Sequence, residues 1–169
     1  MGPNHDIDAL LWQMAEQLRA ALRTEGVHEP ALVGVRTGGV WVAERLRELL
    51  GIETPLGELN IAFYRDDFSR IGVHPTVEPS VLPFEVDGRD LVLVDDILYT
   101  GRTVRAAMNE IFDYGRPRSI RLAVLFERDG RELPIAATVC GAHLGLGEGE
   151  HAKLVGPSPL QLVVQRPAG

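Results

Sequence analysis

The two adjacent carboxylates Asp95 and Asp96 are the residues of this chain whose types and spacing most clearly indicate chemistry. They end an apolar run and precede a short turn that contains Thr100, Gly101 and Thr103. In such a turn, glycine lets backbone N–H groups approach an anion closely, and hydroxyls add donors. Carboxylates repel a phosphate but suit sugar hydroxyls or a hydrated Mg²⁺ ion. The pattern therefore predicts a site for a ribose 5′-phosphate together with Mg²⁺.

The elements on either side of this turn would position it. The run Val92–Val94 is apolar throughout, as expected of a buried strand in a parallel sheet. A helical pattern follows over Val104–Tyr114, and the N–H groups and dipole at its start favour a phosphate. The alternative is that the acidic pair forms a surface turn and that Thr103 only caps the helix.

A second strand–turn–helix unit precedes the first. The short apolar strand Ala31–Val35 runs into the corner Arg36–Gly39, and a helix is predicted over Val40–Leu50. Backbone N–H groups at this corner are suited to a second anionic group, with Arg36 as its charge partner. The alternative is that the two glycines serve packing alone. Trp41 is predicted to be a core or interface residue rather than one that stacks on a ligand.

The remaining pattern alternates strands with helices, which indicates an α/β fold with a largely parallel central sheet flanked by helices. A helix is predicted over Asp6–Arg23 and further strands over Ile120–Phe126, Ala136–Gly141 and Leu160–Gln165. The irregular stretch Phe68–Pro83 is long for a loop in a compact domain. We interpret residues 65–83 as a flap that closes over the site.

Composition excludes several classes of protein. The 169 residues carry a formal net charge of −7, which disfavours nonspecific binding to nucleic acid. The one cysteine, Cys140, excludes an internal disulfide and is predicted to be a buried apolar residue. The apolar runs are too short to cross a bilayer, and the first residues lack the composition of a signal peptide. We expect a single cytoplasmic domain, residues 1–169, that does not bind membranes.

Several blocks together resemble a known family. The acidic pair with its T-G-R-T turn resembles the signature of type I phosphoribosyltransferases. The wider resemblance, to the PyrR family of pyrimidine regulators that are also uracil phosphoribosyltransferases, rests on blocks in one order: Y-R-D-D at Tyr64–Asp67, V-D-D-I-L-Y-T-G-R-T-V-R-A at Val94–Ala106, G-R-P at Gly115–Pro117, L-A-V-L at Leu122–Leu125 and R-E-L-P-I at Arg131–Ile135.

The resemblance implies the type I phosphoribosyltransferase fold, with a small hood over residues 127–145. It implies the reaction of uracil with 5-phosphoribosyl-1-pyrophosphate (PRPP) to give UMP and pyrophosphate. Asp95 and Asp96 would hold the ribose hydroxyls and, through these and water, Mg²⁺; with Arg65 they are the predicted catalytic residues. The predicted substrate-binding residues are Arg36, Thr37, Gly38 and Gly39 for the pyrophosphate, Asp66 in the flap, Ile97, Leu98, Tyr99, Thr100, Gly101, Arg102, Thr103 and Val104 around the 5′-phosphate, and Arg128, Val139 and Cys140 for the base.

Two departures from the family pattern affect the predictions. Relatives usually carry a basic residue at the position of Gly38, so weaker PRPP binding or dependence on Arg36 is expected. The stretch Ala136–Gly149 has no lysine or arginine, which disfavours tight RNA binding. We therefore rank the enzyme above the alternative, an RNA-binding regulator that senses UMP and attenuates pyrimidine genes. Arg19 and Arg23 are predicted to be solvated or part of an RNA-binding patch, and a homo-oligomer, dimer or tetramer, is expected from the resemblance.

Overall fold

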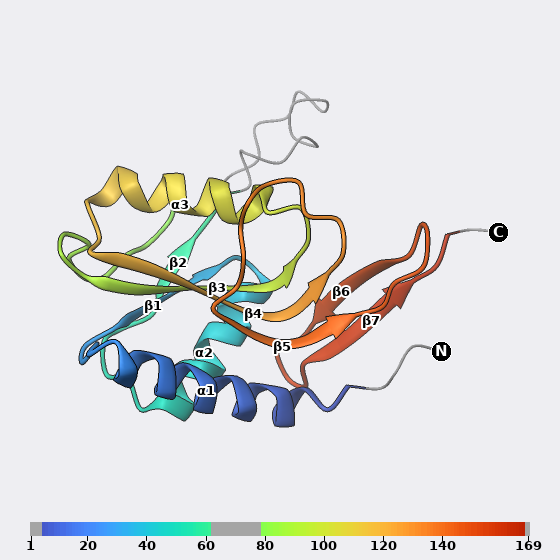
Figure 1. The fold of residues 1–169 in the computed structure, drawn as a ribbon, viewed down its shortest axis with the longest axis horizontal. Coiled ribbons are helices and arrows are strands. Elements are labelled where there is room, and N and C mark those ends of the chain that lie inside the picture. The colour runs from blue at the N-terminus through green and yellow to red at the C-terminus, as the bar shows by residue number, and fades with distance from the viewer. Residues whose placement is uncertain (1–4, 62–78, 168–169) are drawn as a thin grey trace.

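The computed structural model describes residues 5–61 and 79–167. Five parallel strands form the central sheet, in the order β2 (Gly57–Leu59), β1 (Ala31–Val35), β3 (Asp90–Leu98), β4 (Ser119–Arg128) and β5 (Val139–Leu144) (Figure 1). Because the strands are parallel, their carboxyl ends lie along one edge of the sheet. β3 is the middle strand, so the acidic pair lies near the centre of that edge.

Helices cover both faces of the sheet. The helices α1 (Ile7–Thr24) and α2 (Gly38–Leu50) lie on one face, and α3 (Arg102–Tyr114) lies on the other (Figure 1). Alternate residues of β3 serve the two cores: Val92 and Val94 pack on the side of α1 and α2, whereas Leu91 and Leu93 pack on the side of α3. Burial on both faces explains why β1 and β3 are apolar along most of their length. The predicted α/β fold is confirmed.

Both glycine-containing corners lead directly into helices. The sequence predicted helix starts at Val40 and Val104, but α2 begins at Gly38 and α3 at Arg102. Gly101 has φ 96°, a left-handed conformation that favours glycine, and it ends the turn before α3. The backbone N–H groups of the two corners therefore belong to the first turns of helices, where they lack intrahelical acceptors.

Strand boundaries differ from the prediction near the site. β3 continues through the acidic pair to Leu98 and β4 extends to Arg128. β5 begins at Val139 rather than Ala136, because the preceding segment folds back over the turn that follows β3. In that segment, the N–H groups of Glu132 and Leu133 donate to the carbonyl of Thr100, at 2.9 and 3.1 Å.

The C-terminal part forms a separate antiparallel hairpin of β6 (His151–Val155) and β7 (Gln161–Gln165), beside β5 (Figure 1). The sequence predicted a strand at β7 but not β6. Leu154 of β6 is buried in the α1–α2 core, and Leu160 and Leu162 pack against the same core. The apolar side of the hairpin therefore attaches it to the body of the fold.

Only the end of the predicted flap belongs to the described residues. Its main part, with Arg65 and Asp66 of the predicted site, lies outside them. At its end, Val81 forms an isolated antiparallel bridge with Glu58 through two N–H···O bonds of 2.8 Å. The predicted flap therefore returns to the sheet beside β2.

Candidate active site

The acidic pair is held in place by backbone hydrogen bonds at the end of β3. The side chain of Asp95 is buried, and its Oδ1 accepts a bond of 2.8 Å from the N–H of Asp96. Asp96 is half-buried, and its Oδ1 accepts a bond of 2.8 Å from the N–H of Ile97. Charge-assisted bonds of this kind fix the carboxylate positions before any ligand arrives. The interpretation of the pair as a surface turn is therefore wrong.

The glycine corner between β1 and α2 packs directly on the acidic pair. A Cβ atom on Gly38 would lie 2.3 Å from Oδ2 of Asp96, and one on Gly39 would lie 2.6 Å from the carbonyl oxygen of Val94. Only glycine fits at either position without a shift of the surrounding atoms. Close packing thus explains both glycines, and Asp96 occupies the space that a side chain at position 38 would need.

The turn after β3 is supported by the segment that precedes β5. Gly101 lies against Leu133 and Ile135, to which its added Cβ would come within 3.4–3.5 Å. The hydroxyl of Thr100 accepts a bond of 3.1 Å from the N–H of Arg102. The side chain of Arg102 reaches Glu132 at 2.9 Å, an exposed pair that contributes little to stability. The predicted hood region therefore supports the predicted phosphate-binding turn.

A cavity of about 680 Å³ opens beside the acidic pair. Its lining unites the corner after β1, the end of β3, the end of β4 and strand β6. The predicted site residues that line it are Arg36, Thr37, Gly38, Asp95, Asp96, Ile97, Tyr99, Thr103 and Arg128. The other predicted residues in the described part of the chain do not line it: Gly39, Leu98, Thr100, Gly101, Arg102, Val104, Val139 and Cys140.

Val139 and Cys140 pack on opposite faces of the sheet, and Cys140 is half-buried rather than buried as predicted. Val139 is buried in the core beneath α1 and α2, and Cys140 packs against the core beneath α3. Burial, followed by the charge of Glu127, raises the pKa of the Cys140 thiol. A thiol with a raised pKa is a poor nucleophile at neutral pH. The raised pKa therefore favours the protonated form of the Cys140 thiol at neutral pH.

Sequence reasoning missed five residues that line the cavity. Trp41, predicted as a core or interface residue, packs half-buried against the α1–α2 core and also lines the cavity. The others belong to β6: His151, Ala152, Lys153 and Leu154. The available signal was the alternation of polar and apolar residues in H-A-K-L-V, which is typical of a half-buried strand.

Arginine side chains flank the acidic pair on two sides. The guanidinium of Arg128 lies 4.0 Å from the centre of the Tyr99 ring and donates a bond of 3.4 Å to the carbonyl of Glu150. Arg36 lies 3.5 Å from the carboxylate of Glu58. The cavity therefore combines two carboxylates with cationic side chains, which suits a ligand with hydroxyl and anionic groups.

The donor set of the cavity fits a Mg²⁺ ion held mainly by its ligand. Mg²⁺ commonly takes one or two protein carboxylates and completes its shell with water and phosphate oxygens. Asp95 and Asp96 provide such carboxylates at the cavity. Among residues 5–61 and 79–167, no group of three or more His, Cys, Asp and Glu side chains forms a metal cage by itself. The residues present suit an ion that arrives with its substrate.

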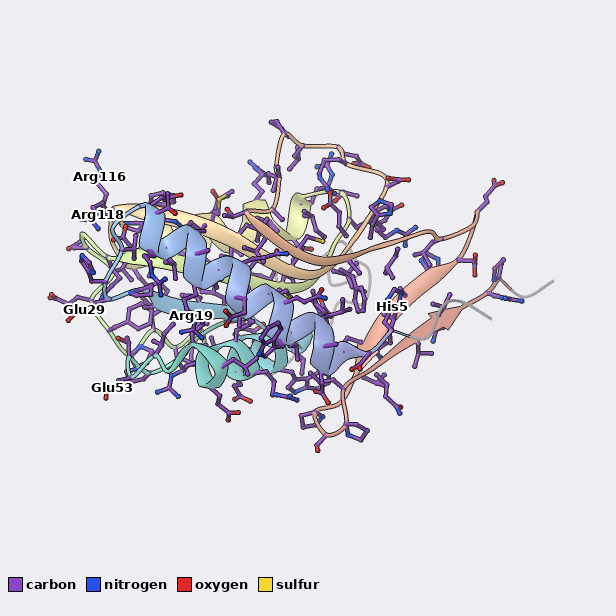
Figure 2. The ribbon with its side chains drawn as sticks, turned by 60° about the horizontal axis from the view of Figure 1, so that its bottom comes forward. His5, Arg19, Glu29, Glu53, Arg116 and Arg118 are labelled. Atoms are coloured by element: carbon purple, nitrogen blue, oxygen red, sulfur yellow. The ribbon has the colours of Figure 1, made fainter. Side chains whose placement is uncertain are left out.

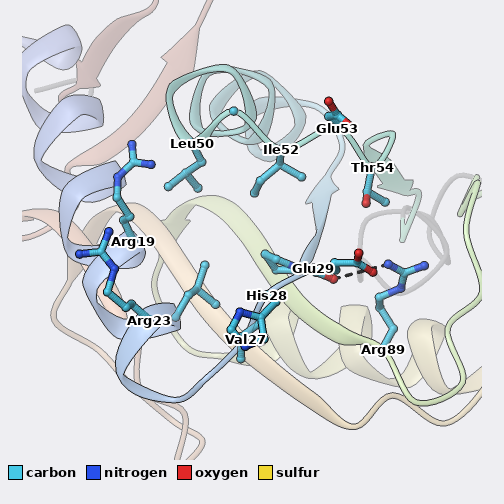
Figure 3. A pocket seen from close by; sticks show the side chains of 13 residues that line it. Arg19, Arg23, Val27, His28, Glu29, Leu50, Ile52, Glu53, Thr54 and Arg89 are labelled. Carbon is cyan, nitrogen blue, oxygen red and sulfur yellow. Dashed lines mark hydrogen bonds between the residues drawn. The ribbon is translucent and has the colours of Figure 1, made fainter.

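A second cavity, of about 670 Å³, lies at the opposite end of the sheet (Figure 3). Arg19 at its rim donates a bond of 2.9 Å to the carbonyl of Leu49, near the C-terminus of α2. Across the cavity, Arg89 donates a bond of 3.5 Å to the carbonyl of Glu29 (Figure 3). These arginines are engaged with backbone carbonyls, and ligands of α/β sheets bind at the carboxyl ends of the strands. The first cavity is therefore the candidate site.

Comparison with known proteins agrees with this fold. Residues 5–142 match the model of the phosphoribosyl transferase domain. Solved structures with a similar fold include a hypoxanthine phosphoribosyltransferase from Trypanosoma cruzi, with a TM-score of 0.70 and 20% identity over 95% of this chain and 91% of that one. A purine phosphoribosyltransferase from Pyrococcus horikoshii has a TM-score of 0.58 and 22% identity over 82% and 84% of the two chains. The fold and the matched domain define a phosphoribosyltransferase.

Curated relatives identify the family more narrowly. Proteins named bifunctional protein PyrR from Nitrosococcus oceani and Pseudomonas fluorescens are 59% and 57% identical to this chain. The matches cover 95% and 92% of this chain and 92% and 93% of the relatives. The chain belongs to the PyrR family, as the sequence blocks predicted.

None of the helices in the described ranges has the length and apolar character needed to span a membrane.

Proposed function

We propose that this protein transfers the phosphoribosyl group of PRPP to uracil, giving UMP and pyrophosphate. The observation that carries the proposal is the cavity in which the acidic pair of β3 meets the glycine corner of β1–α2. Membership of the PyrR family supports uracil as the base. The protein would act in the cytoplasm, and we expect it to form a homo-oligomer.

The residues of the cavity divide into three proposed roles. Asp95 and Asp96 accept hydrogen bonds from the ribose hydroxyls, and the turn Tyr99–Thr103 with the first turn of α3 holds the 5′-phosphate. The corner Arg36–Gly38 contacts the pyrophosphate through backbone N–H groups and the guanidinium. Arg128, on the hood side of the cavity, is proposed to contact the base.

The chemistry needs no nucleophilic side chain from the protein. Cleavage of the bond between ribose C1 and pyrophosphate leaves positive charge on the sugar, and the neighbouring carboxylates favour that charge. The departing pyrophosphate gains negative charge, which Arg36 stabilises. When bound, Mg²⁺ would neutralise pyrophosphate oxygens, with Asp95 and Asp96 holding it through ribose hydroxyls and water. The protein aligns the uracil nitrogen with C1 and keeps water away from it.

A PRPP-dependent assay across uracil, hypoxanthine, guanine and orotate tests the proposal. We expect product with uracil and at least about a hundredfold loss in the double variant Asp95→Asn, Asp96→Asn, as for the loss of other electrostatic stabilisers. Asp113→Asn, which makes the same change on the exposed surface of α3, is the matched control and should keep full activity. Conversion of another base in preference to uracil, or full activity in the double variant, would refute the proposal.

A second activity, binding of pyrimidine-operon leader RNA, is supported by the relatives' description as bifunctional. Arg23 on α1 exposes a guanidinium without a hydrogen-bond partner among the described residues, whereas Arg19 is engaged with Leu49 and Glu16. The net charge of −7 predicts that any such binding is weak and confined to a local patch. A gel-shift titration with the leader RNA at low salt, with and without UMP, tests this binding. If the RNA did not shift, the second activity would be refuted.

A further inference from the structure

Lys153 is a cationic residue of the candidate site that has no role in the proposed reaction. Of the 17 lysines and arginines in the chain, only Lys153 is a lysine, and it lines the cavity from β6. Its side chain is exposed, and no hydrogen bond or ion pair joins it to any residue in the described ranges. The arginines of the cavity are partly engaged: Arg36 with Glu58, and Arg128 with Tyr99 and Glu150. Lys153 therefore brings a charge to the cavity that no group in residues 5–61 and 79–167 neutralises.

Lys153 lines the same cavity as the Arg36–Gly38 corner, and the chain just after β6 approaches that corner. The chain after β6 passes Trp41, whose ring lies 3.3 Å from the position of a Cβ atom on Gly156. Pro157 lines a smaller cavity together with Arg36, Thr37 and Trp41. The strand end that follows Lys153 thus packs beside the corner to which the pyrophosphate is assigned.

In the described part of the chain, Arg36 is the one cationic side chain of the corner itself. Position 38 is glycine, so it supplies no cation, and a side chain there would require Asp96 to shift. Asp95 and Asp96 add negative charge within the same cavity. Apart from Mg²⁺, the partly paired Arg36 is the one cation that the described part of this corner offers a pyrophosphate lying beside two carboxylates, so a further cation there would stabilise the anion. A lysine ammonium is a compact charge on a flexible stem, which suits an anion that must also leave.

We propose that Lys153 binds the pyrophosphate group of PRPP and stabilises it as the leaving group, through a hairpin that lies outside the parallel sheet. This inference rests on the proposed function and assigns a further residue to it. The hairpin would then contribute to catalysis as well as to packing. Uracil, which is neutral, gains little from a full positive charge, so the effect should fall on PRPP and not on the base.

Steady-state kinetics on the whole protein test the assignment. Lys153→Gln should raise KM for PRPP and the inhibition constant of pyrophosphate by about tenfold each, which corresponds to about 1.4 kcal/mol. KM for uracil should be unchanged, and Lys153→Arg should restore most of the loss. Arg116→Gln removes one charge at the opposite end of the sheet from the hairpin (Figure 2) and should behave as the wild type. A KM for PRPP within twofold of the wild-type value, or a change confined to the KM for uracil, would overturn the assignment.

The single lysine also permits a direct measurement that does not depend on catalysis. An amine-selective reagent should label residue 153, located by mass spectrometry, and Mg²⁺ with PRPP or with pyrophosphate should slow that labelling at least about fivefold. In the Arg116→Lys variant, labelling at position 116 should be unaffected and serves as an internal control. Equal protection at both positions, or none at residue 153, would overturn the inference. If the wild type made no UMP but residue 153 were still protected, the proposed function would fail and the anion contact would stand.

Discussion

The Gly38→Ala substitution should lower activity while leaving the stability of the fold nearly unchanged. The added methyl group would lie 2.3 Å from Oδ2 and 2.8 Å from Cγ of Asp96, whereas ordinary contacts begin near 3.4 Å. The carboxylate must therefore move by about 1 Å, the difference between these distances. A displacement of this size in a reacting geometry can lower the rate about a hundredfold, or about 2.7 kcal/mol of activation free energy. We expect a loss of that order in kcat/KM for PRPP.

Stability should change little in the same variant. The collision is with the far end of a side chain, and alanine is favoured over glycine in a helix by about 1 kcal/mol. Loss of the bond between Asp96 and the N–H of Ile97 would offset this gain by about 1 kcal/mol. Gly39→Ala provides the contrast, because its methyl group would lie 2.6 Å from the backbone oxygen of Val94. We expect that variant to lose about 1–3 kcal/mol of unfolding free energy.

For each variant, kcat/KM for PRPP and the midpoint of thermal unfolding are measured. Gly145→Ala is the matched control, since its methyl group would have no neighbour within 4 Å. If Gly38→Ala acts through Asp96, adding it to Asp96→Asn should cost much less than a hundredfold. Full activity in Gly38→Ala, or full additivity in the double variant, would refute the argument that this glycine protects the carboxylate position.

Three further predictions concern groups around the site and at the far end of the sheet. A hydrogen bond from Arg118 lowers the pKa of Asp90 from its ordinary value of 3.8, so the stabilisation is present above that value and lost as the pH falls through the lower folded-state pKa. The Tm difference between wild type and Asp90→Asn should therefore shrink in acid; a constant difference down to pH 2 would contradict this. Because its pKa is raised, the Cys140 thiol should react with iodoacetamide at pH 7 more slowly in the native protein than in urea; equal rates would contradict it. Gly101→Ala should lose about 1–2 kcal/mol in a denaturant titration, since φ is 96°, and an unchanged midpoint would show that the turn tolerates a side chain.

The sequence alone was sufficient to predict the local strand–turn–helix units of this fold. The apolar run before Asp95 and the helical period after Thr103 predicted a strand and a helix, because a strand buried on two faces is continuously apolar and a helix buried on one face repeats its apolar residues every three or four positions. The adjacent carboxylates and the following turn were assigned to one ligand from their chemistry alone. The family was also identified correctly from blocks of residues in a fixed order.

Only the tertiary structure showed which units meet. That Gly38 touches Asp96 depends on β1 and β3 being neighbours, and a contact between residues far apart in sequence leaves no local pattern. The same holds for β6, whose short alternation is too weak a signal until Leu154 is seen in the core. The sequence assigned the backbone near Val139 and Cys140 to the base pocket, which stays a prediction, and only the structure showed that their side chains pack against the cores on the two faces of the sheet. Residue types and spacing determined what chemistry this chain can do, whereas the packing of distant segments decided which side chains share the cavity.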